Sequence, residues 1–378
     1  MRAAIRNISL KTMKPTTALL LVSLLSPASA QEDNQNPYWI EHGAKPVMIE
    51  QTNNGRTQML KFVDFVDGML VVELDGGAGE ASLPVSESMV ATLRMGGIDM
   101  LEINQMTAQE NHSGVLTKLR PSTYPLIKFH QVPESFTQLH APIRALIESL
   151  LMTGELEEAF DVIRRIDLGK VDLKYSKLAI RLMTGFLNTE AFDKAAQITG
   201  MLPVEDEYEE NIGPVIDAAD LLRAAGKHNE VIPLYVEIEK VVPEAFKDNI
   251  KMWLAYSLVL ADRIDEATAI IEALDEPAPD EELFSLYKLL EGSREYRGEK
   301  YADAIDLLTR GFVRAQTSYS WVPEMLYLIG DCYARAEDST AARNVWTEIV
   351  ILYPDSPWSK SATSSLAELK NLEQPINN

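Results

Sequence analysis

The sequence predicts a mainly α-helical fold, in which about six helical hairpins stack into a solenoid with a capping helix, behind a small N-terminal β-rich domain. Three observations support this prediction. Short apolar runs alternate with turn signals between residues 46 and 84. From about residue 139 onwards, apolar residues recur with the period of about 3.6 that is typical of helices. In the same region, small or branched residues recur every 36 to 38 positions, which indicates repeated structural units.

The composition is that of a folded protein with a strongly acidic balance. The 378 residues include 35 Lys and Arg against 57 Asp and Glu, which gives a net charge of −22. At about 150 residues per domain, this length predicts two domains, or one domain and a repeat array. With 46% hydrophobic residues and one cysteine, the chain is neither disordered, nor a collagen, nor a disulfide-stapled scaffold. Its negative charge disfavours binding to nucleic acid and to anionic membrane surfaces.

Residues 1–30 have the features of a secretory signal peptide. An apolar run at residues 18–25 follows a basic segment without acids and precedes the small residues at 28–30, so we expect cleavage after Ala30. The four cations of this segment are Arg2, Arg6, Lys11 and Lys14. Removing them from 35 leaves 31 cations against 57 acids, and the charge of the exported protein becomes −26.

The remaining chain carries no sign of membrane attachment. No cysteine stands near residue 30 to accept a lipid, and no later apolar run is long enough to span a membrane. We therefore expect a soluble periplasmic protein that is not a lipoprotein. The single cysteine, Cys332, lies in an apolar helical pattern and is expected to be a buried, inert thiol.

The segment from residue 46 to 84 is predicted to form a small sheet. The expected strands cover residues 46–52, 57–65, 69–74 and 79–84, with turns at Asn54-Gly55, Asp67-Gly68 and residues 75–77. The segment resembles the small SH3-like barrels that precede helical repeats in exported bacterial proteins, which implies a domain of residues 46–95. We expect residues 31–45 to be flexible, and residues 96–138 to form a connector with helices. Helices are expected at residues 86–95 and 109–119.

Six hairpins are predicted between residues 139 and 356 from the recurring small or branched residues, which we term anchors. An anchor is small where two helices cross closely, and the residue four positions later fills the gap between neighbouring pairs. The anchors are Ala159, Ala195, Val231, Ala267, Ala304 and Ala342, and the residues four positions later are Ile163, Thr199, Tyr235, Ile271, Leu308 and Trp346. Because a repeat array ends in a polar cap, we expect residues 357–378 to form a capping helix and tail, with Trp358 facing the array and Ser359 facing water.

The last unit carries the most specific motif. It reads LxxIGxxY over residues 326–333, followed by the anchor Ala342, by Trp346 and by Tyr353-Pro354. This pattern resembles the tetratricopeptide repeat family, and the resemblance covers about residues 139–356. The last unit and its tail are also similar to periplasmic tetratricopeptide proteins of the bacterial envelope, of the β-barrel assembly lipoprotein and Tol-Pal coordinator type. The resemblance implies a non-enzymatic scaffold for protein interactions, with a role in envelope assembly or maintenance.

The resemblance also implies a partner-binding groove. In the family, the inner surface of the array is lined by first-helix positions, which in this numbering lie 18, 15, 11, 8 and 7 residues before each anchor. The 30 positions selected here carry five cations and four acids, a sum of +1. The candidate partner-binding residues are Arg144, Lys177, Arg223, Tyr256, Tyr296, Arg297, Tyr327, Asp331 and Arg335. Since Tyr and Arg often anchor interfaces, we expect the groove to bind an extended or helical protein segment, with Arg223, Arg297 and Arg335 contacting its carboxylates or backbone.

The sequence contains no motif of catalysis, metal binding or cofactor binding. The five histidines form no HxxxH or HExxH pair, and no CxxC, GxSxG, P-loop or helix-opening GxGxxG occurs. The acidic run at residues 205–210 lacks the spacing of a calcium loop and is expected to be solvated. We therefore predict no catalytic residue, no metal and no cofactor.

Two alternatives stay open at this point. The β-rich domain could bind a cell-wall glycan or another surface polymer, with the repeats as its support. The chain could also be an enzyme whose site no motif reveals, since catalytic carboxylates meet in space and not in sequence. The identity of a protein partner and the oligomeric state are left undetermined.

Overall fold

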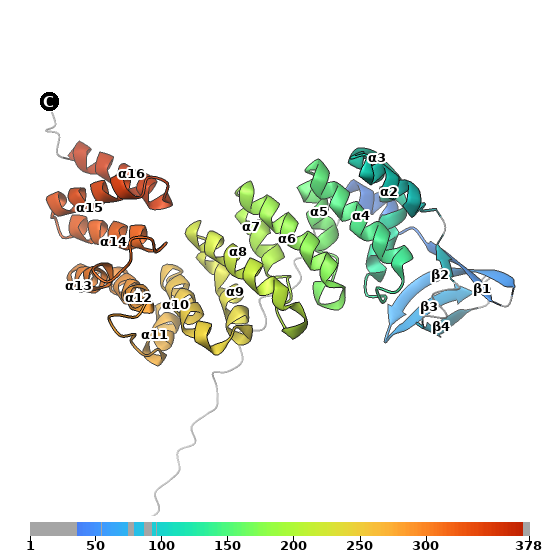
Figure 1. The fold of residues 1–378 in the computed structure, drawn as a ribbon, viewed down its shortest axis with the longest axis horizontal. Helices are drawn as coiled ribbons and strands as arrows, with labels where there is room; N and C mark the ends of the chain where they lie inside the picture. Colours follow the sequence, from blue (N-terminus) through green and yellow to red (C-terminus); the bar gives the residue numbers. More distant parts are fainter. Residues whose placement is uncertain (1–35, 54, 75–78, 87–92, 96, 373–378) are drawn as a thin grey trace, which may run out of the picture.

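The computed structural model describes residues 36–372 except for 54, 75–78, 87–92 and 96. The expected signal peptide and its cleavage site lie outside the described residues. Figure 1 shows an elongated molecule with the β-strands at one end and the last helix at the other. Between them, the helices follow one another in chain order.

The N-terminal sheet has the four strands that the turn signals predicted, and one more. The strands are β1 (Val47–Asn53), β2 (Arg56–Val66), β3 (Met69–Leu74), β4 (Glu80–Pro84) and β5 (Leu93–Met95). They are antiparallel in the order β4-β3-β2-β1-β5, so the fifth strand returns beside the first. The helix expected at residues 86–95 is wrong over β5, because this strand pairs with β1 through partners such as Ile49 and Met95.

One face of the sheet belongs to the same core as the first helices. Alternate residues of β1, β2 and β3 are buried, and the Phe62 ring stacks on Phe129 with 3.8 Å between centroids. Phe129 ends the short helix η4 (Tyr124–Phe129), which follows α2 (Met100–Ala108) and α3 (His112–Thr123). Because these side chains form one continuous cluster with the array, the sheet is a packed part of the array's end.

The segment before the sheet is docked from Asn36 onwards. For residues 36–45, this corrects the expectation that residues 31–45 are flexible. The π-helix η2 (Trp39–Gly43) lies against η4 and α3. The Asn36 amide nitrogen donates to Asp161 at 2.6 Å, and the Arg165 guanidinium lies 4.1 Å from the centroid of the Trp39 ring. An aromatic ring between a guanidinium and an apolar core gains both cation–π and packing energy, which holds the segment in place.

Six hairpins and a final helix make up the rest of the chain, as the spacing of the anchors predicted. The hairpins are α4 (Thr137–Thr153) with α5 (Leu156–Ile163), α6 (Leu173–Asn188) with α7 (Phe192–Thr199), α8 (Ile212–Ala224) with α9 (His228–Val241), α10 (Glu244–Leu260) with α11 (Ile264–Ala273), α12 (Leu283–Arg297) with α13 (Tyr301–Phe312), and α14 (Val322–Arg335) with α15 (Ser339–Leu352). Short 3-10 helices, η5 (Leu168–Lys170) and η6 (Asp206–Asn211), precede α6 and α8. All six anchors are fully buried.

Each hairpin turns at one residue with a left-handed backbone, five positions before the anchor. These residues are Gly154, Glu190, Gly226, Asp262, Glu299 and Glu337, with φ between 58° and 77°. A single left-handed residue ends a helix and reverses the chain within a few residues. The turn therefore repeats with the anchors, although only two of the six turns use glycine, which adopts this conformation without steric cost.

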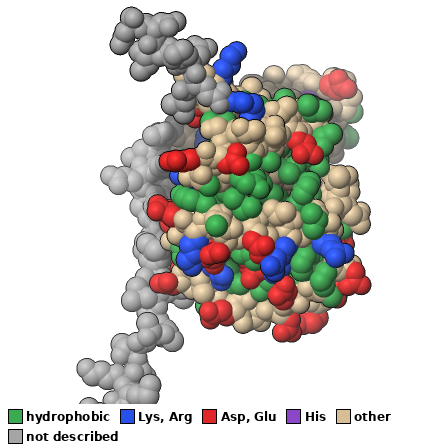
Figure 2. Space-filling view, turned by 90° about the vertical axis from the view of Figure 1, so that its left-hand side faces the viewer, with side chains coloured by type: hydrophobic (Ala, Val, Ile, Leu, Met, Phe, Trp, Pro, Cys, Tyr) green, Lys and Arg blue, Asp and Glu red, His purple; other side chains and the backbone are tan. Residues whose placement is uncertain are grey.

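The final helix α16 (Pro357–Leu372) packs on the last hairpin and forms a small second core with it. Ala362 is fully buried, and Trp358 is half-buried against Tyr327. Ser359 is buried, whereas the sequence placed it toward water. Figure 2 shows this end of the molecule, where hydrophobic side chains gather across the middle of the face. Cys332 is buried as expected, and burial raises the pKa of its thiol to about 12.

Candidate partner-binding site

The family rule selects residues that lie on the first helices of the six hairpins, and we call these 30 positions the first-helix face. They come from α4, α6, α8, α10, α12 and α14. Helix α6 contacts both α4 and α8, and helix α12 contacts both α10 and α14. Equivalent positions of adjacent hairpins therefore lie side by side within each of these two groups of three helices.

The first three hairpins leave this face accessible. None of their fifteen positions is buried. We call these positions the open face; they are Ala141, Arg144, Glu148, Leu151, Met152, Lys177, Ile180, Thr184, Leu187, Asn188, Gly213, Ile216, Asp220, Arg223 and Ala224.

The last three hairpins bury about half of the equivalent positions. Seven of the fifteen are buried: Met252, Tyr256, Val259, Leu286, Leu289, Ser293 and Glu324. The prediction that Tyr256 binds a partner is therefore corrected, because this side chain is only 1% exposed. Its hydroxyl donates a hydrogen bond to the carboxyl of Glu324, which lies at the start of α14, two hairpins further along the chain.

An aromatic cluster explains why these helices close on one another. Trp321, just before α14, donates from its indole nitrogen to the Ser285 hydroxyl at 3.1 Å. Its ring also lies edge-on to Trp253 of α10, with 5.9 Å between centroids. The segment that leads into α14 therefore fills the space between α10 and α12, and such burial of large aromatic surfaces is strongly stabilising.

The candidate cations of the last three hairpins are engaged within the chain. Arg297 donates to the Leu260 carbonyl at 3.3 Å and lies 3.4 Å from the Asp262 carboxylate. Arg335 donates from Nε to Asp331 at 2.6 Å. These contacts occupy guanidinium groups that the sequence analysis assigned to the carboxylates of a partner.

Three of the candidate residues lie together between α12 and α14, and a fourth packs on the capping helix α16. The Tyr296 hydroxyl donates to the same Asp331 carboxylate at 2.5 Å, so Tyr296, Asp331 and Arg335 form one network between α12 and α14. Burial and the hydrogen bond to Asp331 raise the pKa of Tyr296 above its usual range. Tyr327 instead packs on Trp358 of α16, with 5.1 Å between ring centroids.

Arg223 lies at the boundary between the two halves. Its side chain is 10% exposed, and its guanidinium carbon lies 3.6 Å from the centroid of the Trp253 ring. One of its terminal nitrogens lies 3.6 Å from the Asp220 carboxylate, which also accepts a hydrogen bond from Tyr235 at 3.1 Å. Arg223 is thus a stacked, paired side chain that joins α8 to α10, and Trp253 is a neighbour that the repeat pattern did not single out.

The two remaining candidates are also paired, with carboxylates from outside their own hairpins. Arg144 donates to Glu134 at 2.5 Å, and Lys177 lies 3.2 Å from Glu210. Both acids belong to connecting segments, which the repeat rule does not cover. Arg181, one residue beyond the selected positions, donates to Glu148 at 3.0 Å.

His228 packs where the repeat pattern placed it, three residues before an anchor. Its ring lies edge-on to Tyr256, with 6.3 Å between centroids. Burial, together with the positive charges of Arg223 and Arg297, lowers the pKa of His228 to about 4. Its Nδ1 atom is buried and has no partner among the described residues.

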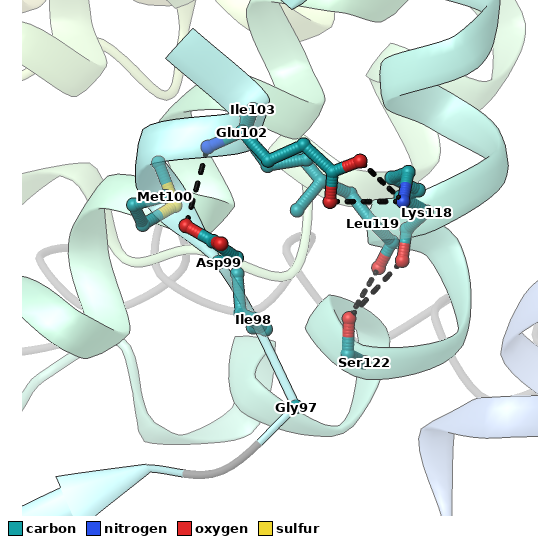
Figure 3. A pocket seen from close by; sticks show the side chains of 9 residues that line it. All are labelled: Gly97, Ile98, Asp99, Met100, Glu102, Ile103, Lys118, Leu119 and Ser122. Carbon is teal, nitrogen blue, oxygen red and sulfur yellow. Dashed lines mark hydrogen bonds and ion pairs between the residues drawn. The ribbon is translucent and has the colours of Figure 1, made fainter. Parts of the chain in front are cut away.

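The described residues form several cavities. Figure 3 shows one of about 570 Å³ between α2 and α3. Its ion pair joins Glu102 and Lys118 at 2.8 Å, and its other carboxylate, Asp99, accepts from backbone nitrogens at the start of α2. Over the described part of the chain, no three His, Cys, Asp or Glu side chains lie close enough together to hold a metal ion. In the same part, no helix is both long and apolar enough to cross a bilayer.

No protein-family model and no curated protein matches the sequence. Among solved structures, the fold is similar to a chain in the crystal structure of the APC/C hetero-tetramer Cut9-Hcn1, at 14% identity and a TM-score of 0.38 over 67% of this chain. That match spans 49% of the other chain, about half of its length. A second similar structure is that of PilF from Pseudomonas aeruginosa, at 15% identity and a TM-score of 0.31, over 61% of this chain and 98% of that chain.

Proposed function

We propose that this protein is an exported, non-enzymatic scaffold that binds a segment of a partner protein on its open face. One observation carries the proposal: none of the fifteen positions on α4, α6 and α8 is buried, whereas seven of the fifteen on α10, α12 and α14 are. A row of parallel first helices with an accessible surface is how stacked hairpins bind extended ligands.

The cellular setting of the proposal comes from the ends of the chain. The basic, apolar and small-residue order of residues 1–30 supports export, and the resemblance of the last hairpin to periplasmic tetratricopeptide proteins supports a role in envelope assembly or maintenance. Mass determination of the protein purified from the periplasm tests export: a chain that begins at Gln31 supports it, and retention of residues 1–30 contradicts it.

Site-specific photocrosslinking in cells tests the binding surface. A photoreactive residue replaces Thr184, which is exposed on the open face, or Gln197, which is exposed on the second helix of the same hairpin. We expect crosslinks to a discrete protein from position 184 and none to that protein from position 197. Equal crosslinking from both positions would contradict a binding surface on the first helices.

A further inference from the structure

We infer that the open face accepts an uncharged, aliphatic segment of its partner, and not the acidic segment that the arginines of the sequence suggested. This inference rests on the proposed function, because it names the chemistry of the partner at that same surface. It follows from two features of the described residues, the position of the aliphatic side chains and the pairing of the charges.

The aliphatic side chains form two pairs at equivalent repeat positions of neighbouring helices. Ile180 and Ile216 both lie fifteen residues before their anchors, and Leu151 and Leu187 both lie eight residues before theirs. All four are half-buried, so each packs on the core and still presents part of its side chain. Because adjacent first helices are in contact, each pair spans two neighbouring helices. Met152 extends the surface on α4 and is 55% exposed.

The cations on and beside the open face are already paired with carboxylates. The four cations are Arg144, Lys177, Arg181 and Arg223, and each lies within 3.6 Å of one of the four acids Glu134, Glu210, Glu148 and Asp220. An acidic partner would therefore find no free cation among these four, and exchanging one exposed ion pair for another contributes little to binding. An aliphatic segment instead removes the exposed parts of the aliphatic side chains from water at no electrostatic cost.

The distance between the helices defines the spacing of the partner's contacts. Packed helices lie about 8–10 Å apart, and an extended chain advances about 3.3 Å per residue. An extended partner that crosses one of these pairs therefore places apolar residues about three positions apart on its two helices. Three helices then need a segment of about seven residues.

A peptide selection on the purified chain of residues 31–378 tests the inference. The probe is a library of random twelve-residue peptides displayed on phage, and the enriched peptides are then measured by fluorescence polarisation. The variants are Leu187→Lys and Met152→Lys on the open face, with Gln197→Lys as the control that adds the same charge to the same protein on a second helix. We expect uncharged peptides rich in Leu, Ile, Val and Met. Their binding should weaken about tenfold or more in both open-face variants and remain unchanged in the control.

Two results would separate the failure of the inference from the failure of the proposed function. Enriched peptides that are acidic or basic and still lose binding in the open-face variants would overturn the inference and leave the proposed function standing. Peptides that bind all variants equally, or no enrichment at all, would overturn both. If Leu187→Lys proves unfolded by circular dichroism, Met152→Lys decides the outcome, because that side chain is mostly exposed in the native protein.

Discussion

The Tyr256 hydroxyl donates a hydrogen bond to the Glu324 carboxyl, although the two residues are 68 positions apart in the chain. The phenol lies on α10 and the carboxyl on α14, so the bond skips the hairpin between them. Both side chains are buried, with exposures of 1% and 5%. This contact joins the first helices of the fourth and sixth hairpins, in the half of the array where seven of the fifteen equivalent positions are buried.

Replacing Tyr256 by Phe should destabilise the array. The change removes one hydroxyl and leaves the Glu324 carboxyl buried without its donor, which costs about 1–3 kcal/mol of the unfolding free energy. Urea unfolding followed by circular dichroism measures the shift. The control is Tyr353→Phe, since the hydroxyl of this half-buried tyrosine has no hydrogen bond among the described residues. An equal shift of the two midpoints would show that the contact with Glu324 contributes nothing.

The stability of the Glu324→Gln variant should rise relative to the wild type as the pH increases. Burial raises the pKa of Glu324, while the hydrogen bond from Tyr256 and the charge of Arg223 oppose that shift. A raised native pKa means that the folded protein binds this proton more tightly than the unfolded chain. The stabilisation that this tighter proton binding gives is therefore present below about pH 4.5, and it is lost as the pH rises through the native pKa of Glu324. The neutral amide does not titrate, so the difference in unfolding midpoint between the variants should move in favour of Gln between pH 4 and 8.

A flat difference over that range would contradict the prediction for Glu324. Glu348→Gln serves as the control, because this carboxylate on α15 is exposed and its removal tests the general effect of one acid fewer.

Protonation of His228 should contribute to acid unfolding. The native pKa of about 4 lies below the usual 6.5, so the folded protein holds this proton less tightly than the unfolded chain. The contribution of the neutral His228 ring to the unfolding free energy is present above pH 6.5, and it is lost as the pH falls toward 4. His228→Phe keeps a ring against Tyr256, and we expect it to reduce the acid-induced loss by on the order of 2 kcal/mol.

Two measurements check the His228 prediction. The imidazole resonances of His228 should still report a neutral ring at pH 5, and the acid midpoint should move in His228→Phe. The same replacement at His112, which is half-buried on α3 and outside this cluster, provides the control. An acid midpoint that moves equally in both variants would contradict a specific role of His228.

Three Gly→Ala variants should separate steric, backbone and entropic effects in one repeat architecture. At Gly330 an added Cβ would lie 2.5 Å from the Trp346 indole nitrogen, so overpacking should cost about 1–3 kcal/mol of unfolding free energy. Gly154 has φ of +77° and no atom within 4 Å of the added Cβ, so only backbone strain of about 1 kcal/mol is expected. Gly213 is helical with equally open surroundings, and Ala there should stabilise by about 0.5–1 kcal/mol. Thermal unfolding of the three variants gives the order of their stabilities. A destabilised Gly213→Ala would contradict the entropic gain expected at that position.

A fragment of residues 31–100 should not fold by itself. It contains the strands but lacks Phe129 of η4, which stacks on Phe62, and the remaining core that covers the inner face of the sheet. We expect a poorly dispersed nuclear magnetic resonance spectrum, because a few strands without a covered apolar face are marginal in water. A well-dispersed spectrum would show an independent domain and would revive the alternative in which this part alone binds a surface polymer.

The local patterns of the sequence account for most of the elements. The anchors predicted six hairpins because the crossing point of two helices admits only a small or branched side chain, and all six anchors are fully buried. The turn signals predicted β1 to β4 because they act within a few residues. The strand β5 and the docked segment around Trp39 were missed, since both depend on partners far away in the chain.

The sequence by itself determined that the chain forms a solenoid of hairpins and which residues lie on its first helices, because both follow from a spacing that repeats along the chain. Only the tertiary structure decided which of those residues a partner can reach. Tyr256 occupies the repeat position of the exposed Thr184, yet it is buried against Glu324. Burial at this position depends on the angles between successive hairpins and on an aromatic segment inserted before α14, and neither is encoded in the spacing of one repeat.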